Sequence, residues 1–258
     1  MADNFNDPFA TNLVGLWDFL NGNPNGDTGT ADNLTQDGTP EGGANISGGR
    51  LHLDGHGDYF DVDGDHGGPE ESVFDLTEGT ISVQFTQEEH VGSSNDTLVN
   101  RGEYKDRDDE GWFAIQVTKY GQIELFHNTG DEHIKLKTAK DLLSPHDNVK
   151  VTYSWDETTG VTLTVENLTT GVTETVTSDQ TGLTLDIGDN DDEIFTFGAR
   201  EKDDGDYDQF FKGSIDYVAV YDRDIQNAVP DGVVDGEEFG EVMGLGYDDS
   251  NAPTNQGG

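Results

Sequence analysis

Short runs of alternating apolar and polar residues occupy most of the chain, and turn-forming Gly, Asp and Asn residues separate them. From Val161 to Leu168 the alternation is strict, so one side of this segment faces a core and the other faces water. Apolar periodicity long enough for a helix is nearly absent. The pattern predicts an all-β fold of antiparallel strands, arranged as a sandwich or a barrel. Strands are expected at Leu13–Phe19, Arg50–Leu53, Tyr59–Val62, Thr80–Thr86, Thr97–Asn100, Trp112–Lys119, Gln122–His127, Lys150–Trp155, Val161–Leu168, Val172–Thr177, Glu193–Gly198 and Gly213–Tyr221.

Two segments fall outside this strand pattern. Gly22–Gly49 is rich in Gly, Asn, Asp and Thr and is expected to form a long surface loop. Within residues 226–258, Gly236–Leu245 is compatible with a short helix and Asp248–Gly258 has the composition of a flexible linker. The sequence therefore predicts one domain, residues 1–225, followed by an acidic tail or linker, and other domains of a longer chain are candidate partners.

The charge of the chain is strongly negative. There are 13 Lys and Arg residues against 54 Asp and Glu residues, a formal net charge of −41. Such a field repels nucleic acid phosphates and anionic lipid surfaces, so neither is an expected partner. The acidity has two explanations that can coexist, adaptation to high salt and local cation binding. No stretch approaches the roughly 18 apolar residues of a membrane span, and residues 1–12 lack a signal-peptide pattern, so membrane insertion is not expected.

Several segments together resemble a known family. The opening, second and closing strands of laminin G-like domains, which belong to the concanavalin A-like jelly-roll superfamily, are similar to Leu13–Phe19, Arg50–Phe60 and Phe211–Tyr221. The internal strands of that family are similar, in the same order, to Gly79–Phe85, Val149–Trp155 and Phe197–Arg200. The resemblance spans about Leu13 to Tyr221. It implies a two-sheet antiparallel jelly-roll sandwich.

The resemblance also implies a calcium site. Calcium takes about six to eight oxygen ligands, which Asp-rich loops can supply. In the pentraxin branch of the superfamily, an Asp-Asn pair before a middle strand joins an acidic loop and a Gln before the closing strand. The residues at similar positions here, expected to bind calcium, are Asn95, Asp96, Glu201, Asp203 and Gln209. The pair is reversed to Asn-Asp and Lys202 interrupts the acidic loop, so this chain departs from the family's pattern at both places.

Two other places have the composition of a cation site. Asp18 in the opening strand and Asp216 in the closing strand are expected on neighbouring strands, and related bacterial domains often hold one calcium where the chain ends meet. The alternative is that each is an ordinary hydrogen-bonded strand Asp. Asn227–Glu238 matches part of an EF-hand loop, although its third place is Val229 and Pro230 lies inside it. The alternative there is a solvated acidic tail.

Signatures of catalysis are missing from the sequence. Retaining glycosidases of this fold carry Glu-x-Asp-x-x-Glu on one strand, whereas the nearest string, Glu201–Asp206, ends in Asp and lies in a Gly-containing loop. There is no Gly-x-Ser-x-Gly elbow, no phosphate-binding Gly loop and no His-Glu-x-x-His zinc motif. The absence of Cys excludes cysteine catalysis and a disulfide scaffold.

Aromatic side chains near these loops provide a way to hold a sugar, because planar rings stack on apolar sugar faces. The exposed candidates are Tyr104, Trp112, Tyr120 and Tyr207, and among them Tyr207 and Tyr104 are the expected ligand-binding residues. The sequence therefore predicts a calcium-dependent, lectin-like carbohydrate-binding module outside the cell or on its surface, with a polysaccharide or glycan as partner. An acidic domain favours neutral or calcium-bridged glycans. The alternatives are a polysaccharide-degrading enzyme on the same fold and a non-catalytic adhesion or spacer domain.

Overall fold

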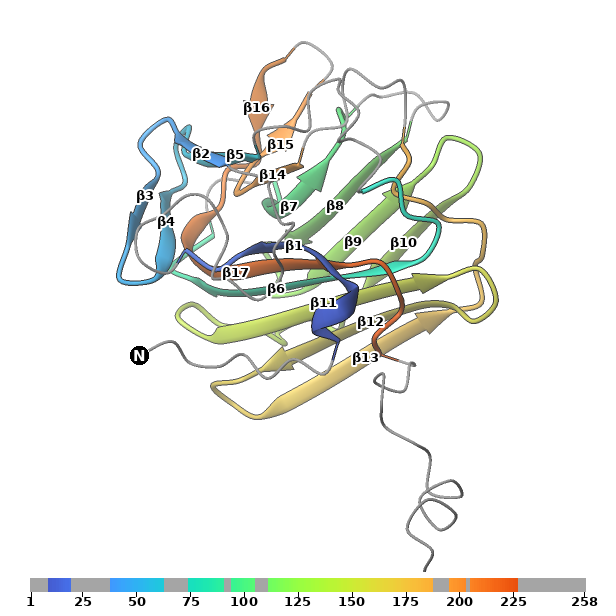
Figure 1. The fold of residues 1–258 in the computed structure, drawn as a ribbon. Coiled ribbons are helices and arrows are strands. Elements are labelled where there is room, and N and C mark those ends of the chain that lie inside the picture. Colours follow the sequence, from blue (N-terminus) through green and yellow to red (C-terminus); the bar gives the residue numbers. More distant parts are fainter. Residues whose placement is uncertain are drawn as a thin grey trace, which may run out of the picture.

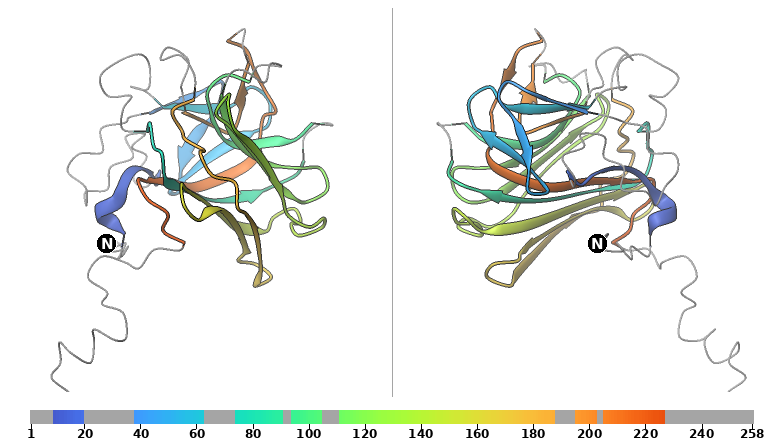
Figure 2. Two further views of the ribbon diagram at one scale, coloured as in Figure 1. Left: turned by 90° about the vertical axis from the view of Figure 1, so that its right-hand side faces the viewer. Right: turned by 60° about the vertical axis from the view of Figure 1, so that its left-hand side comes forward.

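Two antiparallel β-sheets lie face to face as the two layers of a sandwich (Figures 1 and 2). The computed structural model describes residues 9–19, 38–62, 74–90, 94–104, 111–187, 195–202 and 205–226. In spatial order, the eight-stranded sheet contains β13 (Val172–Ser178), β12 (Gly160–Asn167), β11 (Asn148–Asp156), β6 (Gly79–Gln87), β17 (Lys212–Tyr221), β4 (Arg50–Asp54) and β3 (Asn45–Ser47), and its eighth strand, β1 (Leu13–Trp17), pairs with β17. The seven-stranded sheet contains β10 (His133–Lys137), β9 (Ile123–Asn128), β8 (Trp112–Val117), β7 (Asp96–Arg101), β14 (Phe195–Phe197), β5 (Tyr59–Val62) and β2 (Gly38–Glu41).

Two small elements complete the described part of the chain. A hairpin of β15 (Arg200–Glu201) and β16 (Tyr207–Asp208) projects beside β14 and β7, at the top of Figure 1. The 3-10 turn η1 (Ala10–Asn12) precedes β1. Within the described ranges, no helix has the length and apolar character required to cross a membrane.

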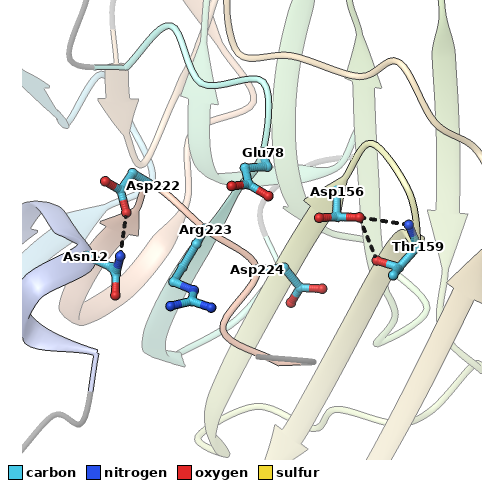
Figure 3. Close-up of a pocket in the computed structure, with 7 residues that line it drawn as sticks. All are labelled: Asn12, Glu78, Asp156, Thr159, Asp222, Arg223 and Asp224. Atoms are coloured by element: carbon cyan, nitrogen blue, oxygen red, sulfur yellow. Dashed lines mark hydrogen bonds between the residues drawn. The ribbon is translucent and has the colours of Figure 1, made fainter. Parts of the chain in front are cut away.

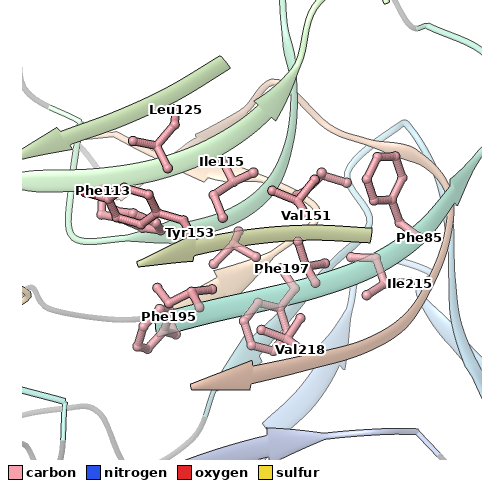
Figure 4. Packing of buried hydrophobic residues seen from close by; sticks show 14 of the residues in the cluster. Phe85, Phe113, Ile115, Leu125, Val151, Tyr153, Phe195, Phe197, Ile215 and Val218 are labelled. Atoms are coloured by element: carbon pink, nitrogen blue, oxygen red, sulfur yellow. The ribbon is translucent and has the colours of Figure 1, made fainter. Parts of the chain in front are cut away.

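The hydrophobic core lies between the sheets, where the apolar sides of the alternating strands meet (Figure 4). In β11, for example, Val151, Tyr153 and Trp155 are buried in this core. Burying one such side chain contributes on the order of 1.5–3 kcal/mol to folding. The residues labelled in Figure 4 come from both sheets and are Phe85, Phe113, Ile115, Leu125, Val151, Tyr153, Phe195, Phe197, Ile215 and Val218.

The first and last strands of the described chain are neighbours, as the sequence predicted. β1 pairs with β17 in antiparallel register, with Trp17 opposite Val218 and Leu13 opposite Tyr221. A second, smaller cluster of buried residues covers this pair and contains Phe9, Leu13, Leu16, Ala219 and Tyr221. The two ends of the domain therefore stabilise the same sheet.

Every strand that the alternation predicts is present, and the all-β, two-sheet antiparallel sandwich is confirmed. The prediction of one long loop at Gly22–Gly49 was wrong for its second part, which contains β2 and β3. β10, β15 and β16 were also not expected. β2, β3 and β10 are edge strands, which depend on hydrogen bonds to one neighbour more than on a buried apolar side. The sequences of β2 and β3 are short and lack a strong alternation, as in Gly-Thr-Pro-Glu of β2, whereas β10, His-Ile-Lys-Leu-Lys, does alternate although it was not predicted.

Candidate functional site

The outer face of the seven-stranded sheet, the side turned away from the core, carries a continuous set of polar and aromatic side chains. Strand register places them in rows, because antiparallel partners lie directly opposite one another. We call one of these the polar row, and it consists of Thr97 on β7, Gln116 on β8, Glu124 on β9 and Lys137 on β10. Ile115, Leu125 and Leu136, which alternate with them, point into the core. The polar row therefore lies on the outward side of the same strands whose inward side chains build the core.

Hydrogen bonds join the polar row to two residues from loops. Asn95 donates from Nδ2 to Gln116 Oε1 at 3.0 Å and to Glu124 Oε1 at 3.3 Å. The Gln116 amide in turn donates to Thr97 Oγ1 at 3.0 Å and to Gln209 Oε1. Gln209 has a positive φ of 53°, a conformation that a non-Gly residue adopts rarely and at some cost. The backbone around Gln209 is therefore held in place by this network.

Charged side chains on this face are paired. Glu124, with only 3% of its surface exposed, lies between two lysines, with its Oε1 at 2.8 Å from Lys135 Nζ and its Oε2 against Lys137 Nζ. On the hairpin, Arg200 binds Asp208 through two parallel bonds, from Nε and from Nη2, each of 2.9 Å. This is the bidentate geometry with which Arg recognises carboxylates.

An aromatic row, which we define as Tyr104, Trp112 and Phe126, lies next to the polar row. Trp112 stacks on Phe126 with ring centroids 4.9 Å apart, and Tyr104 meets Trp112 edge-on at 5.0 Å. Cations lie over both ends of the row, with Arg200 3.8 Å from the Tyr104 centroid and Lys135 4.1 Å from that of Phe126. Tyr104 and Phe126 are half-buried, whereas Trp112 is 7% exposed. Tyr104 thus belongs to a larger aromatic surface than the sequence suggested.

Tyr207, the other predicted sugar-binding ring, lies across the hairpin from Glu201 and stacks on Tyr59. The two ring centroids are 4.1 Å apart, so one face of Tyr207 is already covered by the protein. Burial raises the pKa of the Tyr207 hydroxyl, and the negative charges of Glu201 and Asp61 raise it further. The hydroxyl therefore stays protonated at neutral pH and can take part in hydrogen bonds as donor or acceptor.

The structure brings together only part of the predicted calcium ligands. Asn95 and Gln209 meet at Gln116. Asp96 instead points to the inner side of the sheet, where its Oδ2 accepts a bond of 2.8 Å from Gln87 and lies 2.9 Å from His90 Nδ1. Glu201 is buried in the hairpin, and Asp203 lies outside the described residues. In the ranges that the structure describes, no three His, Cys, Asp or Glu side chains are grouped as a metal site.

Asp18 and Asp216, the second predicted calcium pair, lie where β1 meets β17. Asp216 forms an ion pair with Arg50, with Oδ1 2.7 Å from Nε. Burial raises the pKa of Asp216, and the Arg50 charge opposes that shift. The guanidinium group thus supplies a positive charge at the place where a cation was expected. The partial EF-hand at Asn227–Glu238 lies outside the described residues.

A pocket of about 440 Å³ lies at the end of the sandwich where β11 and β17 finish (Figure 3). Its lining consists of Asn12, Glu78, Asp156, Thr159, Asp222, Arg223 and Asp224. Asp156 accepts bonds from the hydroxyl and backbone N–H of Thr158 and from Thr159, which lower its pKa. Burial raises the pKa of Glu78, and the neighbouring Asp156 raises it further. Sequence analysis did not predict this pocket, because its residues come from four separate segments.

Sequence analysis also missed Gln116, Glu124, Phe126 and Lys135. A signal was available, since the strands at Trp112–Lys119 and Gln122–His127 place Trp112 and Phe126 on their outward sides. Large aromatic residues at outward positions of a strand are informative because water is an unfavourable neighbour for them. Of the other predicted rings, Tyr120 is the most exposed, with half of its surface accessible, and lies in the turn at the far end of β8.

Comparisons with known proteins identify the class of fold. No protein-family model matches the chain, and no curated protein matches it in sequence. Among solved structures, the CBM40 of the Ruminococcus gnavus IT-sialidase, bound to α2,3-sialyllactose, is 16% identical with a TM-score of 0.50, over 67% of this chain and 89% of that one. The NanB sialidase of Streptococcus pneumoniae, as its K499G mutant, is 15% identical with a TM-score of 0.52, over 74% of this chain and 27% of that one.

A third similar structure is the receptor binding domain of botulinum neurotoxin mosaic serotype C/D. It is 10% identical with a TM-score of 0.53, over 83% of this chain and 48% of that one. At these identities the likeness concerns the fold. The chain has the two-sheet, antiparallel jelly-roll β-sandwich fold that these similar structures contain.

Proposed function

We propose that this protein is a carbohydrate-binding module whose ligand lies against the outer face of the seven-stranded sheet. The observation that carries the proposal is the aromatic row of Tyr104, Trp112 and Phe126, which runs beside the hydrogen-bonded polar row on one sheet face. Rings contact the apolar faces of sugars, while accessible amides, here those of the half-buried Asn95 and Gln209 beside the buried Thr97 and Gln116, bind sugar hydroxyls. The similarity to the CBM40 fold supports this function by analogy.

Paired variants test the location of the site. We expect Tyr104→Ala to weaken glycan binding roughly fivefold, since one aromatic contact contributes on the order of 1 kcal/mol. Tyr120→Ala is the matched control, because it removes an exposed ring at the far end of β8. Binding is measured by retention on immobilised polysaccharides and by calorimetry with the retained ones. Equal binding by both variants and the parent would place the ligand elsewhere, and retention by none of the polysaccharides would favour an adhesion or spacer domain.

The acidic pocket is the place to test the alternative of a polysaccharide-degrading enzyme. Two carboxyl groups with opposite pKa shifts, as in Glu78 and Asp156, are the usual arrangement of an acid and a base in glycoside hydrolysis. We propose that the protein binds without cleaving, and expect no new reducing ends and no unsaturated products from the retained polysaccharides. Product release that Glu78→Gln abolishes would instead identify an enzyme.

The finer parts of the proposal are a laminin G-like identity, an extracellular location and calcium dependence. Strand segments in family order support the first, and the proposed glycan ligand is the argument for the second. The meeting of Asn95 and Gln209 at Gln116 is compatible with the third. If calcium binds the folded state alone, a concentration a hundredfold above its dissociation constant raises the free energy of unfolding by about 2.7 kcal/mol. Equal melting temperatures in calcium and in chelator, at matched ionic strength, would argue against calcium.

A further inference from the structure

We propose that the saccharide bound by this face is uncharged, and that Asp208 and Glu124 set this preference by occupying the cations that would otherwise bind an acidic sugar. This inference rests on the glycan-binding function proposed above and specifies its ligand class. It concerns a carboxylate-free saccharide, in contrast to the sialyllactose present in the similar CBM40 structure.

The guanidinium group of Arg200 is the first part of the argument. Arg binds carboxylates through two parallel N–H bonds, and this is how proteins commonly recognise an acidic group. In this structure Nε and Nη2 of Arg200 both bind Asp208, at 2.9 Å each. The flat side of the same group covers the Tyr104 ring at 3.8 Å. A sugar carboxylate would have to displace Asp208, whereas a neutral sugar leaves the pair intact.

The two lysines at the other end of the aromatic row are occupied in the same way. Glu124 offers one oxygen to Lys135 and the other to Lys137, and Lys135 also lies 4.1 Å from the centroid of Phe126. Two lysines and one glutamate leave a single positive charge there. The carboxyl groups of Asp61 and Glu201, whose charges raise the pKa of Tyr207, add negative charge at the hairpin end of this face. The described cations beside the aromatic row, Arg200, Lys135 and Lys137, therefore each have a carboxylate partner.

Lys202, the other cation of the hairpin, also has a carboxylate partner, and the charge of the whole chain also disfavours an acidic ligand. Lys202 lies 3.7 Å from Asp206. The net charge of −41 repels anionic ligands over the distance of a Debye length, about 8 Å at physiological ionic strength. Local pairing and the overall field thus both disfavour an acidic sugar, while aromatic rings and amides remain suited to a neutral one.

The test compares neutral saccharides with carboxylate-bearing counterparts. The probes are soluble β-1,4-glucan, β-1,3-glucan and mannan, each beside its C6-carboxylated form, and lactose beside 3′-sialyllactose. We expect the parent protein to bind the neutral member of a pair at least tenfold more tightly. Asp208→Asn frees Arg200 and should lower the ratio of neutral to acidic affinity at least threefold. Asp131→Asn, which removes the same charge from the exposed turn between β9 and β10 without freeing Arg200, Lys135 or Lys137, is the matched control and should leave the ratio unchanged.

Each outcome decides the inference. If the parent binds a carboxylated form as tightly as the neutral form or more tightly, the inference is overturned and the proposed glycan-binding function still stands. An unchanged ratio of neutral to acidic affinity in a folded Asp208→Asn variant has the same consequence. If Asp208→Asn melts early, Glu124→Gln replaces it, because that variant frees Lys135 and Lys137 instead. An unchanged ratio in a folded Glu124→Gln variant also overturns the inference. Binding of neither member of any pair rejects the proposed function and the inference together.

Discussion

His127 and Arg101 are polar residues buried completely inside the sandwich, and distant segments supply their partners. His127 lies with Nδ1 2.9 Å from the Tyr153 hydroxyl and Nε2 2.8 Å from the backbone oxygen of Thr184. Because a carbonyl oxygen can only accept, Nε2 donates and Nδ1 accepts. Arg101 donates to the backbone oxygen of Leu185 and lies over two core rings. Such groups are tolerated in a core only when they are hydrogen-bonded.

The buried imidazole predicts a loss of stability in mild acid. Burial lowers the pKa of His127 to about 4, against an ordinary value of 6.5. The unfolded chain therefore binds a proton between these values that the folded chain does not, so stability falls as pH decreases from 6.5 to 4. The total effect is about 3 kcal/mol. We expect His127→Gln to be less stable than the parent at pH 7 and to approach it at pH 4, measured by urea unfolding at each pH; a constant difference would contradict this.

At the scale of elements, the hairpin of β15 and β16 depends on the turn that leads the chain out of the seven-stranded sheet. Gly198, between β14 and β15, has a φ of 89°. Its N–H donates to the Leu98 oxygen at 3.1 Å, and its own oxygen accepts from Phe211 at 2.8 Å. A Cβ at this position would lie 2.3 Å from Cδ1 of Leu53. The turn therefore combines a backbone conformation and a close approach that only Gly allows.

A pair of glycine variants separates these two effects. Gly205, in the hairpin turn, has a φ of 73° but no atom within 4 Å of a Cβ. Gly205→Ala should cost about 1–2 kcal/mol, from the backbone conformation alone. Gly198→Ala should cost about 1–3 kcal/mol more, because Leu53 must move within the packed core. Denaturant unfolding followed by tryptophan fluorescence measures both, and equal losses would show that the core absorbs the added methyl group.

At the scale of the whole molecule, self-repulsion between carboxylates opposes folding. Salt shortens the Debye length from about 10 Å at 0.1 M to about 3 Å at 1 M. With a net charge of −41, we expect the melting temperature to rise steadily from 0.1 to 1 M KCl. CaCl₂ at the same ionic strength is the comparison. An equal rise of the melting temperature in the two salts supports adaptation to high salt, and a larger rise in CaCl₂ supports specific cation binding. A fall of the melting temperature in KCl contradicts both.

The site could be predicted from the sequence in part. Tyr104 and Gln209 were identified and do lie on the outer face. The inward orientation of Asp96, however, could not be predicted from the sequence. In β7 the register shifts between Thr97 and Val99, a bulge that leaves Asp96 on the inner side and Thr97 on the outer one. Such a bulge reverses which residues face out, and the local alternation does not reveal it.

The sequence by itself determined the strands that alternate strongly, because a period of two is a local property that each segment carries alone, and its resemblance to laminin G-like strands implied the two-sheet arrangement. It also determined the charge of the surface. Only the tertiary structure decided which outward residues meet. Gln116 and Gln209 are 93 residues apart in the chain and Tyr59 contacts Tyr207, and both contacts depend on strand order, register and the turn at Gly198. The candidate site is made of such long-range pairs, since binding surfaces require side chains from several segments at one place, and strand pairing together with the adjoining loops supplies them.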